Sequence, residues 1–220
     1  MKAVLSADLV GYTKLDPLRA HEVIGELKSF ISEIEGQQIK SNVAFNFQVR
    51  RGDSIQGQIN DVSRAFEIGL LLKAAVTQMA LGSQIRRRHP DMDIRLAIGL
   101  GEIEEADSGL VNEAFGEAYV NSGRTLDRMK KERRLFAIKT PVPEWDRELD
   151  TQCRLLEAVL SGWNIASAEI TFWLLKGYTE MEIADILNIS QSAVNQRKKK
   201  AGWSGIEAMN TRFKELTRNS

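Results

Sequence analysis

Two prolines separated by one residue divide this chain into parts of different character. The segment Thr140-Pro141-Val142-Pro143 cannot lie inside a sheet or a helix, because proline lacks the backbone N–H that both structures use. Before this segment the apolar residues follow both strand and helix periods, and after it they follow the helix period alone. We therefore expect an α+β domain over residues 1–140 and a small all-α domain over residues 141–220.

The first part predicts the element order β-α-β-β-α-β-α-β. Asp16-Pro17 is a helix start, since the aspartate can accept from free N–H groups and proline fits the first helical position. Alternating residues on both sides of Asp53 predict a β-hairpin with this aspartate in its turn. The order contains the split β-α-β arrangement of ferredoxin-like folds, so we expect one antiparallel sheet covered by helices. The remaining predicted elements are a strand over 2–7, helices over 62–81 and 117–131, and strands over 93–103 and 135–139.

Composition restricts the partners and the compartment. With 30 basic and 30 acidic residues the chain is neutral, which argues against a surface that is basic throughout but allows a local basic patch. The single cysteine, Cys153, excludes an intrachain disulfide, and its helical, leucine-rich surroundings favour a core position. Since no apolar run of about 18 residues and no secretory leader are apparent, we expect the cytoplasm as compartment.

Two short helices are predicted near the C-terminus. Thr179 and Glu182 form a capping box, in which each residue satisfies a free backbone donor of the other. Ser190 caps a second helix that runs to about Ala201, and further upstream Ser167 is predicted to cap a preceding helix. Such a pair, joined by about three residues, has the helix-turn-helix layout. We expect this unit over residues 166–203, with Ala184, Ile189 and Val194 in one small core.

The second helix of this pair carries side chains suited to DNA. Asparagine and glutamine can bond both edge groups of adenine, and lysine and arginine suit phosphates. An alternative is a helical hairpin that only packs against a partner protein. The predicted DNA contacts are Gln191, Ser192, Asn195, Gln196, Arg197, Lys198, Lys199 and Lys200.

The segment from Tyr178 to Val194 (YTEMEIADILNISQSAV) resembles the helix-turn-helix of sigma-factor region 4 and of LuxR-type regulators. Those families read promoter or operator DNA with the second helix. The resemblance therefore implies DNA as a partner and regulation of transcription as the function.

Asp8 and Asp53 are candidate ligands for a cation. Asp8 ends the first strand and Asp53 lies in a hairpin turn, and in a ferredoxin-like sheet these strands can be neighbours. Two adjacent carboxylates repel, so they usually need a cation or a shared proton, and Mg²⁺ prefers such oxygen ligands. From the spacing alone we favour the alternative in which each aspartate caps a turn.

The same residues lie in segments that resemble class III nucleotidyl cyclases. The matching segments are Ser6–Thr13 (SADLVGYT), Arg51–Asp53, Arg95–Ile103 (RLAIGLGEI) and Gly116–Arg124 (GEAYVNSGR). The resemblance implies that Asp8 and Asp53 hold Mg²⁺ or Mn²⁺ with a nucleotide, that Asn121 and Arg124 are catalytic, and that the chain forms a homodimer. Residues 52–57 (GDSIQG) and 116–119 (GEAY) resemble the SatD family more closely still.

The substrate half of the cyclase pattern is altered. Val49 stands where the cyclases usually carry a purine-selecting lysine, and Asn121 and Arg124 are three residues apart instead of four. One residue turns a helical side chain by about 100°, so these two cannot both take the family's places. We therefore predict a DNA-binding regulator whose degenerate cyclase-like domain dimerises and binds a nucleotide or metal. The alternative is a divergent cyclase whose helical tail serves assembly.

Overall fold

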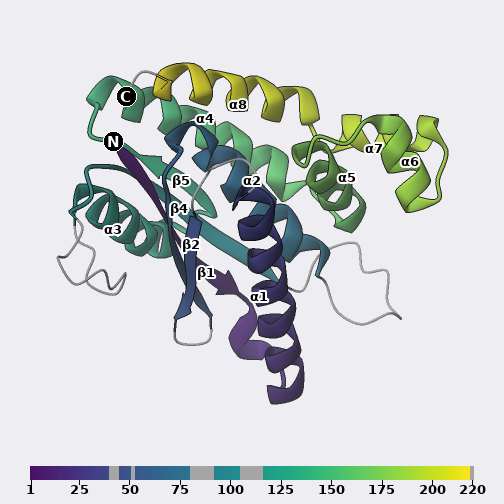
Figure 1. The fold of residues 1–220 in the computed structure, drawn as a ribbon, viewed down its shortest axis with the longest axis horizontal. Helices are drawn as coiled ribbons and strands as arrows, with labels where there is room; N and C mark the ends of the chain where they lie inside the picture. Colours follow the sequence, from purple (N-terminus) through teal and green to yellow (C-terminus); the bar gives the residue numbers. More distant parts are fainter. Residues whose placement is uncertain (40–44, 51–52, 80–91, 105–115, 219–220) are drawn as a thin grey trace.

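The protein is described here from a computed structural model that covers residues 1–39, 45–50, 53–79, 92–104 and 116–218. Within these residues a five-stranded sheet is covered by helices (Figure 1). The strands are β1 (Lys2–Val10), β2 (Phe45–Arg50), β3 (Ser54–Ile59), β4 (Asp93–Gly101) and β5 (Phe136–Lys139). The helices are α1 (Pro17–Ile39), α2 (Ala65–Gln78), α3 (Glu117–Glu132), α4 (Pro143–Ser161), α5 (Ile165–Leu175), α6 (Glu180–Leu187), α7 (Gln191–Lys200) and α8 (Trp203–Thr217), with short 3-10 helices η1 (Tyr12–Lys14) and η2 (Val62–Arg64).

The sheet has the strand order β2-β3-β1-β4-β5, with β1 at its centre. The predicted order of strands and helices is confirmed, but the prediction of a purely antiparallel sheet is wrong, because β5 pairs parallel to β4. The physical reason is the connection between them. Helix α3 carries the chain back to the end from which β4 started, and a crossover of this kind makes the next strand parallel.

The two faces of the sheet differ in chemistry. Along β1 the odd-numbered residues, such as Leu5, belong to the main core together with residues of α1 and α2. The even-numbered Ser6 and Asp8 project to the other face, where they contact α3. Helix α2 is apolar on most of its faces and is buried along almost its whole length, because it lies between the sheet and helices α5 and α8.

In the second half of the chain, α4 begins within the two-proline segment, and the predicted Ser167 cap is wrong. Helix α4 begins at Pro143 itself, since at the first helical position the missing N–H leaves no hydrogen bond unmade. Helix α5 is capped by Asn164, whose Oδ1 accepts from the Ser167 N–H at 2.9 Å. Ser167 therefore lies inside the first turn, where it donates to the cap instead of forming it.

The second half of the chain shares its core with the sheet. Buried residues of α4, α5 and α8, among them Leu156, Ala168 and Phe213, belong to the same cluster as the residues of β1 and α2. Helices α6 and α7 instead have a small cluster of their own with α5. The division at residue 140 into separate domains stays a prediction. Among the described residues, no helix is both long and apolar enough to cross a bilayer.

Candidate functional site

Helices α6 and α7 form a compact pair at one end of the molecule (Figure 1). The predicted capping box is present: Thr179 Oγ1 accepts from the Glu182 N–H, and Glu182 Oε2 accepts from the Thr179 N–H at 2.8 Å. Helix α6 ends at Asn188, which adopts the left-handed conformation with φ 50° that asparagine tolerates. Ser190 then caps α7 by accepting from the Ala193 N–H at 3.2 Å, as predicted.

A small apolar cluster fixes this pair against α5. Ile170 of α5, Ile183 and Ala184 of α6 and Val194 of α7 are all buried in it, and Ile189 of the turn packs against them. The predicted sharing of one core by the two helices and their turn is thus confirmed. One face of α7 is held in place by this cluster, and the opposite face is exposed.

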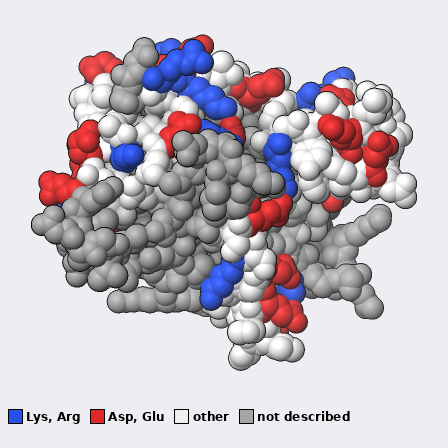
Figure 2. Space-filling model, in the orientation of Figure 1, with Lys and Arg blue, Asp and Glu red and all other residues white. Residues whose placement is uncertain are grey.

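The predicted DNA contacts fall into two groups. The exposed group is Gln191, Ser192, Gln196, Lys199 and Lys200, and the partly buried group is Asn195, Arg197 and Lys198. Acidic and basic side chains are intermixed on this end of the molecule in the view of Figure 2. The exposed group is accessible to a ligand, whereas the partly buried group is less accessible.

Acidic residues of the neighbouring helices engage the partly buried group. Glu180 of α6 binds Lys198 Nζ at 2.8 Å and accepts from Asn195 Nδ2 at 3.5 Å, while Glu169 of α5 binds Arg197 at 3.1 Å. The hydrogen bond from Lys198 lowers the pKa of the Glu180 carboxyl below its ordinary value. Sequence reasoning missed both glutamates, since their partners lie 18 and 28 residues away and no local spacing marks them.

A second candidate site lies where β1 meets the β2–β3 hairpin. Asp8 is opposite Ser54 in the antiparallel register, and the Leu9 N–H donates to the backbone carbonyl of Asp53 at 2.9 Å. The predicted adjacency of these strands is confirmed, so the two aspartates are one residue out of register on neighbouring segments. The sequence pattern predicts the turn over Arg51-Gly52-Asp53-Ser54, and its first two residues lie outside the described part of the chain.

Asp8 already has a cationic partner within the chain. Its Oδ1 accepts from the Ser54 hydroxyl at 2.7 Å, and the ammonium of Lys130 on α3 lies 2.6 Å from Oδ2. This Oδ2 is buried and accepts no hydrogen bond of ordinary geometry in the described structure. Among the described residues, the ion pair with Lys130 therefore compensates the loss of its hydration. The donor set of Asp8 and Asp53 suits an oxygen-preferring cation, but an ammonium holds the position at Oδ2. No cluster of three or more potential ligand side chains occurs among the described residues.

Asn121 and Arg124 lie elsewhere on α3. Asn121 Nδ2 donates to the Leu100 carbonyl at 2.8 Å, and Arg124 is exposed. Leu100 is opposite Ala3, which is five residues along β1 from Asp8 and hence about 17 Å away. Within one chain the structure therefore brings Asp8 and Asp53 together but leaves Asn121 at the other end of the strand.

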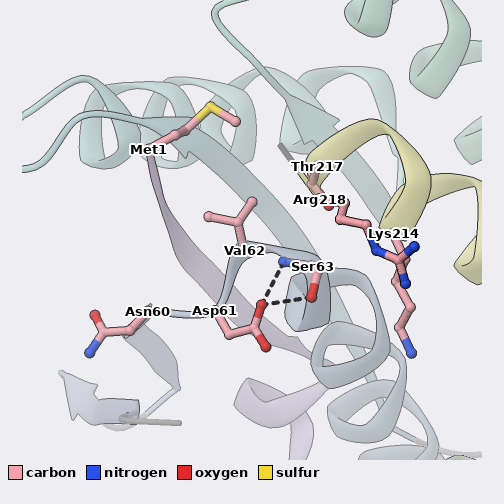
Figure 3. A pocket seen from close by; sticks show the side chains of 8 residues that line it. All are labelled: Met1, Asn60, Asp61, Val62, Ser63, Lys214, Thr217 and Arg218. Atoms are coloured by element: carbon pink, nitrogen blue, oxygen red, sulfur yellow. Dashed lines mark hydrogen bonds between the residues drawn. The ribbon is translucent and has the colours of Figure 1, made fainter. Parts of the chain in front are cut away.

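A polar hollow of about 280 Å³ lies where the two ends of the chain meet (Figure 3). Its lining includes Met1, the corner before α2 and the last turn of α8. Asp61 points to Ser63 and accepts from both its N–H and its hydroxyl, and Lys214 is paired with Glu67. Because these polar groups already serve the chain's own corner and helix contacts, we assign no ligand to this hollow.

Comparison with known proteins adds little. No protein-family model matches the chain, and no curated protein matches it. A solved structure described as a bacterial light-regulated adenylyl cyclase aligns with 62% of this chain and 74% of its own length, at 10% sequence identity and a TM-score of 0.39. A likeness this distant carries no conclusion about fold or function.

Proposed function

We propose that this chain is a DNA-binding regulator that reads DNA with α7 as the second helix of a helix-turn-helix. The observation that carries the proposal is the two-sided character of α7. Its inner face is fixed by Val194 in a buried cluster, while polar and cationic side chains of its outer face are exposed. A helix held in this way can enter a major groove without rearranging the protein.

The exposed side chains divide into those suited to base contacts and those suited to phosphate contacts. Gln191 and Gln196 carry amides that can pair with a base edge, and Lys199 and Lys200 carry charges for phosphate contacts. Lys198 is less available, since its ammonium is held by Glu180. We therefore assign to Lys198 a role in fixing α7 on α6, in place of the phosphate contact expected from the sequence.

The test compares two single variants on one selected duplex. Sites are first selected from random duplexes, and affinity is then measured by fluorescence anisotropy at several salt concentrations. We expect Gln196→Ala to lose about 1–3 kcal/mol of discrimination at one base position. Lys199→Ala should weaken binding to every sequence and reduce the salt slope by about one.

Lys28→Ala is the matched control, since Lys28 is an exposed lysine of α1, far from α7 in sequence. It should leave both affinity and salt slope unchanged. If no duplex is preferred over bulk DNA, or if the α7 variants behave like the control, the proposal fails.

The proposal includes a homodimer formed through a ferredoxin-like, cyclase-like N-terminal part. A dimer suits DNA reading, because two recognition helices about 34 Å apart can enter successive major grooves. Sedimentation velocity over a range of concentrations tests this part. A monomer at all concentrations, both free and on DNA, would contradict it.

A divergent nucleotidyl cyclase is the second candidate, favoured by the placement of Asp8 beside the hairpin turn that carries Asp53. Incubation with Mn²⁺ and each nucleoside triphosphate, followed by chromatography, tests it. A cyclic product that disappears in Asp53→Ala would establish the enzyme and end the proposal of a degenerate domain.

A further inference from the structure

We propose that the Lys130 ammonium neutralises the Asp8 carboxylate and that, as long as this ion pair is formed, it prevents a divalent cation from binding at Asp8 and Asp53. The proposal concerns the N-terminal part of the chain and is independent of DNA binding. It assigns a competitive role to a residue of α3 that no motif identifies.

The first step of the argument is that Asp8 needs a positive partner. The residue is only 8% exposed, and an ionised carboxylate that is buried without compensation is costly. Ser54 satisfies one oxygen with a neutral hydroxyl. The other oxygen has the Lys130 ammonium at 2.6 Å and no hydrogen bond of ordinary geometry in the described structure. The ammonium therefore supplies the neutralising charge.

The second step is that Lys130 can leave. Its side chain is 47% exposed, whereas that of Asp8 is 11% exposed, and a lysine stem is long and flexible. Asp127, one turn earlier on α3, lies 3.8 Å from the same ammonium and is itself 77% exposed. Lys130 thus has a second, solvated partner to which it can turn, and a metal ion could then reach Asp8.

The third step is competition for one oxygen. A divalent cation at Asp8 would bind Oδ2, since Oδ1 already accepts from the Ser54 hydroxyl. Two cations cannot share the position at Oδ2 without repulsion. Binding therefore requires that the Lys130 ion pair be broken first. Removal of the lysine charge should therefore increase the affinity of this site for a divalent cation, because no ion pair has to be broken first.

The experiment measures Mn²⁺ alone on the full chain, by the electron paramagnetic resonance signal of free Mn²⁺ and by thermal unfolding with and without the ion. We expect Lys130→Met to bind Mn²⁺ at least about tenfold more tightly than the original chain, since one charge at contact distance has been removed. Mn²⁺ should also raise the Tm of this variant. The added affinity should vanish in Lys130→Met combined with Asp8→Asn.

Two controls separate this role from a loss of surface charge. Lys131→Met removes the adjacent exposed lysine, and Lys130→Arg keeps a cation at the same place. Both should bind Mn²⁺ as the original chain does. Lys130→Gln serves as the second neutral variant if Lys130→Met fails to fold. Equal Mn²⁺ binding by the original chain and the neutral variants, or tight binding that survives Asp8→Asn, would overturn the proposal.

Discussion

Gly99 shows how a single missing side chain sets the distance between α3 and the sheet. A Cβ at this position would stand 2.3 Å from both the Ala118 carbonyl oxygen and the Ser122 nitrogen. Both are backbone atoms, so no rotamer change can relieve the clash. We predict that Gly99→Ala destabilises the protein by about 1–3 kcal/mol or more, measured by urea unfolding.

Gly123→Ala is the control for this prediction. Gly123 lies within α3 itself, and a Cβ there would meet nothing within 4 Å. Alanine should therefore stabilise the helix by about 0.5–1 kcal/mol. If the two variants are equally stable, α3 does not pack against β4 as closely as the structure places it.

Cys153 is a residue whose chemistry is set by burial. Burial raises the pKa of its thiol to about 12, with Arg134 opposing the rise and Glu157 adding to it. The reactive thiolate is therefore scarce near neutral pH. We predict that Ellman's reagent modifies the native protein very slowly and the urea-unfolded protein rapidly. Rapid modification under native conditions would contradict the buried position that the sequence predicted.

At the scale of elements, the sequence predicts what is local. The cap of α1 at Asp16, the capping box of Thr179 with Glu182 and the Ser190 cap each join residues within one helical turn, so spacing alone identifies them. The pair of short helices α6 and α7 follows from the same local signals.

Contacts between distant elements could not be predicted in this way. The ion pairs of Lys130 with Asp8 and of Lys198 with Glu180 depend on which helix faces lie together. The parallel pairing of β5 depends on where α3 returns the chain, and periodicity carries no information on that. For the candidate site, the residues of α7 could be identified from the sequence, but the acidic side chains that restrain three of them could not.

Helix α7 is also fastened at its C-terminal end, by a buried hydrogen bond. The indole N–H of Trp163, just before α5, donates to the Ala201 carbonyl at 3.0 Å. We predict that Trp163→Phe costs about 1–3 kcal/mol, because it leaves a buried carbonyl without its donor. Urea unfolding gives the loss, and amide hydrogen exchange should increase most at the end of α7.

Trp145→Phe is the comparison for this variant. Trp145 is partly buried, whereas Trp163 is buried, and the indole N–H of Trp145 has no partner among the described residues. Its replacement should change stability less and leave exchange in α7 unaltered. An equal effect of both variants would show that ring volume matters and the hydrogen bond does not.

At the scale of the whole molecule, α2 links the sheet to the C-terminal helix. It is buried between them, and Glu67 on this helix binds Lys214 of α8 at 2.7 Å and also Arg64 of η2. Burial acts to raise the pKa of Glu67, but the hydrogen bonds from Lys214 and Arg64 outweigh it, and the pKa lies below its ordinary value of 4.5. Helices α2 and α8 are thus held together by a charged contact that depends on pH.

The sign of this dependence follows from the lowered pKa. The folded state binds the Glu67 proton less readily than the unfolded state, so the contact stabilises the fold fully above the ordinary pKa and is lost as the pH falls through the folded pKa. We predict that Glu67→Gln reduces the free energy of unfolding by about 1–3 kcal/mol near neutral pH. The difference in free energy of unfolding between the variant and the original chain should shrink as the pH falls from neutral to below 4.5, the ordinary pKa of this carboxyl, measured by urea unfolding at each pH. Glu215→Gln, which breaks an exposed pair with Arg212 on the same helix, should leave the free energy of unfolding almost unchanged. A gap for Glu67→Gln that stays constant across this range would mean that the carboxylate charge does not tie α2 to α8.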